Sequence, residues 1–424
     1  MKNTEGLGYT DLLKRHRPEM LYGTVFNFFS NFGQTFFISL LLPGMALAAG
    51  IAYEEAGYLY SMATLTSAAL LALLGKWSDR LSSRAYGIIC CSLFTVGCGL
   101  ALGSSHLLLL AASILLIRWA GQGLLSHAST TAMAKQFPQR PAAAFALTSL
   151  GFPIGESILP IMATALISSG HHQWVWGLVL ASSCLVLLPL AILGSRGFRA
   201  VPAAETTSTH RSLAGKNRVW RDPRLWVLLP HLVSLGFVMT AILFFSSILL
   251  KTKGWDIWWL ATGLTCFALT RAFFTMGIGS WFKSRDALPM LVVTKLPLLI
   301  GCGLLLIPEA GAWMLIIFFL LAGSSQGIQM VISRTALTEL YGPAIIGTAK
   351  SATTSLVILS TALAPAIYSW AGQADDTHLT HVVLWGNLAL MAFATIFTQC
   401  LMPWLKRQSQ LHAETVLDSD AHSR

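Results

Sequence analysis

The stretch Gly75–Arg84, GKWSDRLSSR, decides the fold because it places ionic side chains between two long apolar runs. The ionic residues are Lys76, Asp79, Arg80 and Arg84. Ionic side chains need water or lipid headgroups, whereas both flanking runs are apolar enough to lie in lipid. The stretch is therefore predicted to be a short loop at a membrane surface that joins two spanning helices.

The whole chain has the composition of a membrane protein. Of its 424 residues, 54% are hydrophobic and 11% are charged, and the mean hydropathy is +0.64. These values exclude a soluble globular protein of this length. Because a spanning helix needs about 20 apolar residues, the chain has room for about twelve spans. We predict them near residues 21–42, 56–75, 85–104, 106–134, 142–168, 174–194, 225–250, 256–282, 287–307, 312–339, 345–371 and 379–403, and number them helix 1 to helix 12 in this order.

The distribution of charge favours a membrane topology over nucleic-acid binding, despite a net charge of +10. Most of the 28 Lys and Arg residues fall in predicted cytoplasmic segments, whereas the predicted outer loops hold just Lys251 and Lys253. By the positive-inside rule, both termini are cytoplasmic. We therefore expect an integral, multi-pass protein of a bacterial inner membrane, surrounded by lipid and with no nucleic-acid partner.

The chain is predicted to consist of two repeated halves. Gln122 is echoed by Gln326, and Pro160 by Pro365, at nearly the same offset. Such repetition indicates duplication of a six-helix unit. The predicted segments are a cytoplasmic N-terminal segment (1–20), a first bundle (21–194), a cytoplasmic linker (195–224), a second bundle (225–403) and a cytoplasmic tail (404–424).

The loop and the fourth span resemble the major facilitator superfamily. The spacing of Gly75, Asp79, Arg80 and Arg84 is similar to that of the family's signature loop between helices 2 and 3. The run LIRWAGQG around Arg118 resembles the family's signature in helix 4. The resemblance implies an all-α membrane fold of twelve spanning helices in two pseudo-symmetric six-helix bundles. It also implies a secondary transporter of a small molecule.

Two ionisable residues are expected deep inside spans. Arg118 and Gln122 lie one turn apart in helix 4, and Glu156 lies in helix 5. At 1.5 Å per residue, Arg118 and Glu156 are roughly 24 and 21 Å from the cytoplasmic ends of their helices, so we expect them to pair. Gly151 and Gly155 would allow the two helices to approach closely. The arginine either lines a substrate and proton pathway or simply ties helix 4 to the carboxylate.

Helix 1 presents a polar stripe of Asn27, Asn31 and Gln34 at helical spacing. Such a stripe faces the interior of a bundle, where helix–helix hydrogen bonds and substrate contact explain it equally well. We therefore include Asn31 and Gln34 among the candidate pathway residues and leave both explanations open.

Arg271 in helix 8 resembles an arginine of the monocarboxylate and oxalate:formate carriers, and the resemblance implies an anionic substrate. Phe267 stands where the monocarboxylate carriers have an aspartate. Gln326 in helix 10 joins the candidate pathway as the repeat of Gln122. Lys295 precedes Pro297 and is expected to reach the inner headgroups, as a structural residue.

The predicted mechanism is alternating access, with protons as the coupling ion and Glu156 as the titratable acid. His127 and His231 are interpreted either as packing residues or as proton relays. Asp79 is expected to face the N-terminus of helix 11 and to latch the inner gate.

We expect a monomer without metal or cofactor, and no enzyme, because the sequence has no phosphate loop, zinc motif or nucleophile elbow. The alternatives are an exporter of drugs or amphipathic metabolites, which would use an aromatic lining instead of Arg271, and a non-transporting membrane sensor on a carrier fold.

Overall fold

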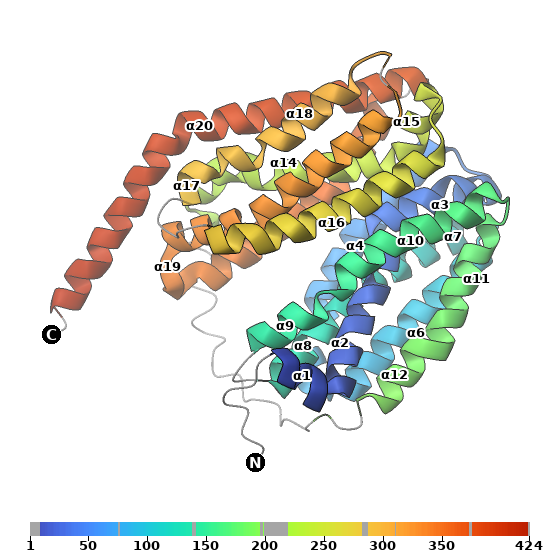
Figure 1. Ribbon diagram of the computed structural model, residues 1–424, viewed down its shortest axis with the longest axis horizontal. Coiled ribbons are helices and arrows are strands. Elements are labelled where there is room, and N and C mark those ends of the chain that lie inside the picture. The colour runs from blue at the N-terminus through green and yellow to red at the C-terminus, as the bar shows by residue number, and fades with distance from the viewer. Residues whose placement is uncertain are drawn as a thin grey trace. The chain divides into compact units, whose positions relative to one another are not determined.

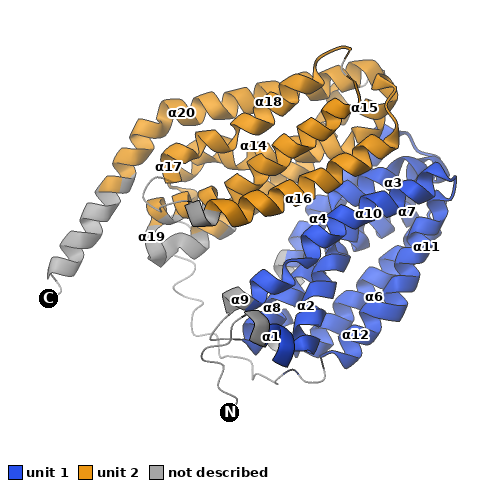
Figure 2. Ribbon diagram, in the orientation of Figure 1, with its two compact units in different colours: residues 1–205 blue, residues 206–424 orange. Residues whose placement is uncertain are grey.

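Helices are the regular structure throughout the part of the chain that the computed structural model describes, and no strand occurs there. The described residues are 9–74, 77–137, 141–195, 198, 219–281, 287–309, 311–372 and 375–422, with some side chains inside these ranges excepted. The chain divides into two compact units, Met1–Glu205 (unit 1) and Thr206–Arg424 (unit 2), shown in Figure 2.

Unit 1 is a bundle of long helices, several of which are interrupted (Figure 1). Its elements are α1 (Tyr9–Arg15), α2 (Arg17–Ser30), η1 (Asn31–Gly33), α3 (Thr35–Ala48), α4 (Tyr53–Leu74), α5 (Trp77–Arg80), α6 (Ser83–Leu102), α7 (Leu107–Leu116), η2 (Ile117–Leu125), α8 (Ser126–Gln136), α9 (Pro141–Thr148), α10 (Gly151–Ser168), α11 (His172–Ser182), η3 (Ser183–Leu187) and α12 (Leu188–Leu193). The interruptions are one 3₁₀ turn, η1, and two π-helical segments, η2 and η3.

Unit 2 is likewise a bundle of long helices (Figure 1). Its elements are α14 (Pro223–Phe244), α15 (Ser246–Lys253), α16 (Ile257–Trp281), α17 (Ala287–Met290), η5 (Val292–Thr294), α18 (Leu296–Leu305), α19 (Trp313–Ala371) and α20 (Asp376–His422). The predicted helices 312–339 and 345–371 form one helical run, α19, and α20 continues past the predicted end at 403.

Within the described residues, ten helices are long and apolar enough to cross a membrane, and an eleventh span is the bent pair Arg17–Gly33 and Thr35–Ala49. α19 supplies two of the ten, Trp313–Tyr341 and Ala352–Ala371. The remaining predicted span, 56–75, corresponds to α4, a helix of 22 residues that is not among these candidates. The chain is therefore an all-α membrane protein with ten or eleven candidate spans.

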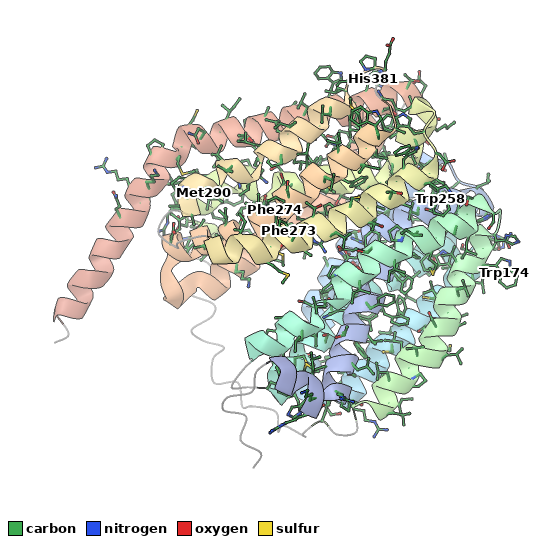
Figure 3. All side chains as sticks on the ribbon, viewed as in Figure 1. Trp174, Trp258, Phe273, Phe274, Met290 and His381 are labelled. Carbon is green, nitrogen blue, oxygen red and sulfur yellow. The ribbon has the colours of Figure 1, made fainter. Side chains whose placement is uncertain are left out.

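Large apolar side chains point outward from both units. Trp174 in α11 is 64% exposed and Phe273 in α16 is 71% exposed, and Trp174 projects from the edge of unit 1 in Figure 3. Trp258, which is 41% exposed, lies in the first turn of α16. A Trp at a helix end suits the membrane–water interface. This outer surface therefore matches lipid rather than water.

Local sequence signals set several helix ends. Ser82 caps α6 by accepting a hydrogen bond from the backbone N–H of Ala85 at 3.2 Å. Asp222 caps α14 in the same way, since its carboxylate accepts from the Arg224 N–H at 2.9 Å. Gly254, with φ of 65°, ends α15 in the left-handed conformation that glycine adopts without strain.

The predicted segment boundaries stay predictions. Residues 199–218, most of the predicted linker, lie outside the described residues, as do the predicted loop residues Gly75 and Lys76.

Candidate functional site

Arg118 is buried in the middle of unit 1, with 3% of its surface exposed. It lies in η2, the π-helical segment of the span Leu107–Gln136. Its Nε donates to the Thr64 hydroxyl at 3.1 Å and its Nη1 donates to the Gly33 carbonyl at 3.1 Å. The guanidinium also lies 4.9 Å from the centre of the Tyr60 ring. Arg118 is thus held by a hydroxyl, a carbonyl and an aromatic face, all of them uncharged.

Predicted helix 1, which the structure forms as α2, η1 and α3, breaks where it crosses predicted helix 4, which is α7, η2 and α8. The break at η1 bends the span by 42°, and a Cβ added to Gly33 would lie 2.3 Å from the Gln122 N and 2.6 Å from the Ile117 carbonyl oxygen. Gly121 faces the same crossing, since its added Cβ would lie 3.1 Å from the Gly33 Cα. The two backbones therefore meet without intervening side chains, which presents the Gly33 carbonyl to Arg118.

Two glutamines meet beside this crossing. The Gln122 Nε2 donates to the Gln34 Oε1 at 3.0 Å, and both side chains are half-buried. Gln34 follows the break in helix 1, and Gln122 lies in η2 one turn beyond Arg118. The π-helical geometry of η2 widens the helix at this place, as π-bulges often do at functional sites. The sequence pattern did not predict this π-helix, and the Gly121–Gly123 pair is the local signal for it.

The rest of the polar stripe joins helix 1 to helix 5. The Asn27 Nδ2 donates to the Thr148 carbonyl at 2.9 Å, and the Asn31 Nδ2 donates to the Gly151 carbonyl at 3.3 Å. Asn31 is fully buried and also donates to the Phe28 carbonyl at 3.0 Å. For Asn27 and Asn31 this geometry favours helix–helix hydrogen bonds over substrate contact.

Glu156 lies on α10 and is 9% exposed. The expected ion pair with Arg118 is not formed, because Glu156 is not among the groups that hold the guanidinium. Gly151 and Gly155 face helix 1 rather than helix 4. A Cβ on Gly151 would lie 2.2 Å from the Thr24 carbonyl oxygen, and one on Gly155 would lie 2.2 Å from the Asn31 Nδ2. The two glycines therefore allow α10 to pack closely against helix 1. They contact the part of helix 1 that lies just before Gly33, whose carbonyl accepts the hydrogen bond from Arg118.

In unit 2, Arg271 is half-buried on α16, with its guanidinium 5.4 Å from the centre of the Phe267 ring. Gly323 and Gly327 of α19 fit against this helix. Their added Cβ atoms would lie 2.6 Å from the carbonyl oxygens of Phe267 and Arg271 respectively. Gln326 lies between these glycines, and its buried Oε1 has no hydrogen-bond partner among the described residues. The sequence did not predict this close packing of α19 on α16.

The signature loop is described in part. Gly75 lies outside the described residues, and so do the side chains of Asp79 and Arg80, although their backbones belong to α5. Arg84 is exposed at the start of α6. The Lys135 Nζ, from the last turn of α8, donates to the carbonyls of Ser78 and Leu81, the latter at 3.3 Å. A cation at the C-terminal carbonyls of a helix is favourable, so Lys135 holds the loop to the end of helix 4.

The interpretation of Lys295 as a headgroup contact is wrong. Lys295 is fully buried in unit 2, and its Nζ donates to the Gln329 Oε1 at 2.5 Å. His231 is also fully buried, with its Nε2 3.3 Å from the Thr294 hydroxyl. His127 lies 3.1 Å from the Tyr86 hydroxyl through its Nδ1. In the described residues no group of three or more His, Cys, Asp or Glu side chains could hold a metal ion.

Solved transporter structures share this fold. The chain is similar to a mutant form of the nucleoside transporter NupG, with a TM-score of 0.72 and 13% identity over 90% of this chain and 99% of that chain. It is similar to a bacterial homolog of the human lysosomal transporter Spinster, with a TM-score of 0.70 and 15% identity over 94% of this chain and 97% of that one. A POT family transporter in complex with 5-aminolevulinic acid gives a TM-score of 0.70 and 12% identity over 93% and 96%. At these identities the likeness establishes the fold alone.

No curated protein matches the chain. The sequence model of the Major Facilitator Superfamily matches residues 24–365, most of both units. The match agrees with the all-α membrane fold and with the similarity to solved transporters. The chain therefore belongs to the Major Facilitator Superfamily, and it is a multi-pass secondary transporter of a small molecule, not an enzyme.

Proposed function

We propose that this transporter carries a small organic solute with an anionic group, such as a carboxylate, by alternating access driven by a proton gradient. The observation that carries this proposal is the environment of Arg118. A guanidinium keeps its charge under all physiological conditions. At 3% exposure it is held by the Thr64 hydroxyl, the Gly33 carbonyl and the Tyr60 ring, none of which is an anion.

A buried cation held by neutral groups makes its surroundings electropositive, because few water molecules are present to screen the charge. An anionic group that enters beside it is stabilised, whereas a second cation is repelled. Gln34 and Gln122 are half-buried and offer neutral hydrogen-bonding groups next to Arg118. In the other unit, Arg271 and Gln326 are the proposed counterparts. The proposal also includes the resemblance of Arg271 to an arginine of the monocarboxylate and oxalate:formate carriers, which implies an anionic substrate.

Proton coupling is assigned to Glu156. It is a titratable acid, 9% exposed, on a helix that packs directly on helix 1 through Gly155. A proton that binds or leaves such a carboxylate changes the charge beside a helix interface, and this can bias a two-state equilibrium. We also propose that both termini are cytoplasmic in a bacterial inner membrane, since the predicted outer loops hold few basic residues.

Uptake into proteoliposomes tests the proposal. The panel contains carboxylates, amino acids, peptides, nucleosides and cationic drugs, because the similar solved structures include nucleoside and POT transporters. We expect accumulation of a carboxylate that rises with an inward proton gradient. Arg271→Ala should abolish this uptake, and Arg271→Lys should weaken it because lysine loses the guanidinium fork. Equal uptake of a neutral analogue by the wild type would refute the anionic substrate, and efflux of amphipathic drugs would favour an exporter.

A further inference from the structure

Unit 2 buries an amine that the proposed mechanism does not use. Lys295 is 0% exposed and follows the 3₁₀ turn η5, at the point where the helix of residues 287–305 is broken. An ammonium taken out of water costs several kcal/mol unless a counter-ion or a full set of acceptors compensates. No ion pair in the described part of the chain involves Lys295.

The hydrogen bonds of Lys295 suit an amine that can lose its proton. A charged ammonium has three N–H groups and needs an acceptor for each when it is buried. The described residues provide one acceptor, the Gln329 Oε1 at 2.5 Å. The Gln329 Nε2 faces the Leu232 carbonyl at 3.5 Å, which keeps the Oε1 turned toward the lysine. The site therefore holds a nitrogen whose charged form is under-satisfied.

His231 provides a second protonatable nitrogen. The Thr294 hydroxyl donates to the Leu291 carbonyl at 2.7 Å, so its oxygen accepts from His231 Nε2 at 3.3 Å. We assign the ring proton to Nε2 on this basis. Nδ1 is then a lone-pair acceptor, and it is buried without a partner among the described residues. His231 and Lys295 belong to one cluster, because Thr294, which bonds His231, directly precedes Lys295, and Gln329, which bonds Lys295, faces the carbonyl of Leu232 next to His231. A positive charge on one nitrogen therefore opposes a second positive charge on the other.

No other charge faces the pair from the described residues of the elements packed around it. α14 contributes His231, and α19 contributes the neutral Gln329; Glu339 of α19 instead accepts from the Ala287 N–H at 3.2 Å. α17 and α18 contain no acidic, basic or histidine residue, although α18 has the thiol of Cys302. α20 has no such residue between His381 and Lys406. The side chain of Arg334 in α19 is not described.

The repeat shows that the fold does not require these nitrogens. The offset that carries Gln122 onto Gln326 carries Asn27 onto His231 and Cys91 onto Lys295. Cys91 is fully buried and Asn27 is 4% exposed, so unit 1 fills the equivalent places with an uncharged thiol and an amide. A lysine and a histidine in those places of unit 2 have no packing role that a neutral residue could not fill.

We propose that Lys295 and His231 form a proton-binding site in unit 2 that holds a single proton between them. The proton comes from water and binds to the lone pair of either the Lys295 Nζ or the His231 Nδ1, which raises the charge of the pair from zero to one. A second proton is opposed by like-charge repulsion in a site of low polarity. The use of this site in coupling rests on the proposed function, whereas its existence does not.

A proton titration of the purified full-length protein in detergent, without substrate, tests the site directly. The variants are Lys295→Met, His231→Gln and the double variant, and the matched control is Lys251→Met, an exposed lysine of the same unit. We expect the wild type to take up one proton more than the double variant across the neutral pH range. Each single variant should keep that uptake with a shifted midpoint, because the remaining nitrogen has lost its competitor. The control should titrate like the wild type in this range.

The inference is overturned if the double variant titrates like the wild type, or if it loses two protons, which would mean two independent groups. If the double variant does not fold, unshifted midpoints in both single variants overturn the inference equally. Proteoliposomes then separate this site from the proposed function. We expect the double variant to lose proton-driven accumulation and to keep exchange, and a wild type without any proton-driven accumulation would refute the coupling while leaving the titration result intact.

Discussion

The two units bury their cations in places that do not correspond. The repeat offset carries Arg118 of unit 1 onto Ala322 of unit 2, and it carries Cys91 of unit 1 onto Lys295 of unit 2. All four positions are buried, at 3% exposure or less. Among the described residues, each unit thus has one buried lysine or arginine, and the other unit has a small uncharged residue at the equivalent position.

The difference between the two cations is chemical. Arg118 has two hydrogen bonds of 3.1 Å and an aromatic face at 4.9 Å, which suits a group that is always charged. Lys295 has one hydrogen bond, to a neutral amide, which suits a group that can be neutral. Unit 1 therefore provides a permanent positive charge and unit 2 provides one that we propose to be switchable. The predicted repeat therefore does not extend to the buried basic residues.

Gly33→Ala should have the largest effect, because it breaks the crossing that presents a carbonyl to Arg118. The new Cβ would lie 2.3 Å from the Gln122 N and 2.6 Å from the Ile117 carbonyl oxygen, which are backbone atoms and cannot swing aside. Overpacking of this kind costs about 1–3 kcal/mol, occasionally more. We expect a lower unfolding temperature in detergent and loss of uptake.

Gly236→Ala in unit 2 and Gly99→Ala in unit 1 are the controls for this prediction. The Cβ on Gly236 would meet the side chains of Thr361 and Val357 at 3.1 and 3.3 Å, and the one on Gly99 would meet nothing within 4 Å. Both variants should unfold closer to the wild type than Gly33→Ala does. A Gly33→Ala protein as stable as the Gly99→Ala protein would show that helix 1 can move away from helix 4.

Arg118→Met should separate function from stability. The substitution removes the two hydrogen bonds to Thr64 and Gly33, but it also removes the cost of burying a charge that has no counter-ion. Because these two effects oppose each other, we expect the unfolding temperature to stay close to that of the wild type. Uptake should fall by about tenfold or more, since a hydrogen bond from the guanidinium to the proposed anionic substrate would be worth about 1.5–3 kcal/mol. Arg118→Lys should recover little, because one ammonium cannot reproduce the fork that reaches both Thr64 and Gly33. If the Arg118→Met protein took up substrate at the wild-type rate, Arg118 would not be part of the substrate site.

Glu156→Gln should have a narrower effect than the arginine variants. Glutamine keeps the shape of the side chain and cannot release a proton, so proton-driven accumulation should be lost while exchange of substrate across the membrane continues. Proteoliposomes with and without an inward proton gradient measure the two modes. A Glu156→Gln protein that still concentrates its substrate would falsify the role of this acid, and the Lys295–His231 pair would then be the remaining candidate for coupling.

The fold was predictable from the sequence, and the contacts of the site were not. The apolar runs and the ionic loop around Asp79 specify spanning helices, because lipid leaves the backbone no other choice. Depth along a helix can be counted from the chain, and it suggested that Arg118 and Glu156 pair. Depth does not give the direction in which a side chain leaves the helix. In the structure, Arg118 donates to the Gly33 carbonyl of helix 1, and α10, which contains Glu156, packs against helix 1 at Asn31.

Lys295 shows the same limit. A lysine near a proline at the predicted end of a span is expected to snorkel to the headgroups. Its position depends on packing with elements distant in the chain, since its Nζ bonds Gln329 of α19, which in turn faces the Leu232 carbonyl of α14. The π-helical segment around Arg118 likewise packs against Gly33, a residue distant in the chain. Such contacts between distant segments are absent from any local pattern.

Lys251→Met should have the smallest effect, and it contrasts an exposed lysine with the buried Lys295 of the same unit. The Lys251 Nζ lies 2.5 Å from the Asp376 carboxylate, with the two side chains 77% and 40% exposed. Exposed ion pairs contribute little, so the unfolding temperature at neutral pH should stay close to that of the wild type. The hydrogen bond to Asp376, and then its charge, raise the pKa of Lys251. Because the folded pKa exceeds the unfolded value of about 10.4, the stabilisation is complete below that pH and is lost as the pH rises through the folded pKa. Thermal unfolding at neutral and at strongly alkaline pH should therefore differ slightly more in the wild type than in Lys251→Met, and a large loss of stability at neutral pH would contradict the assignment of this pair to the exposed surface.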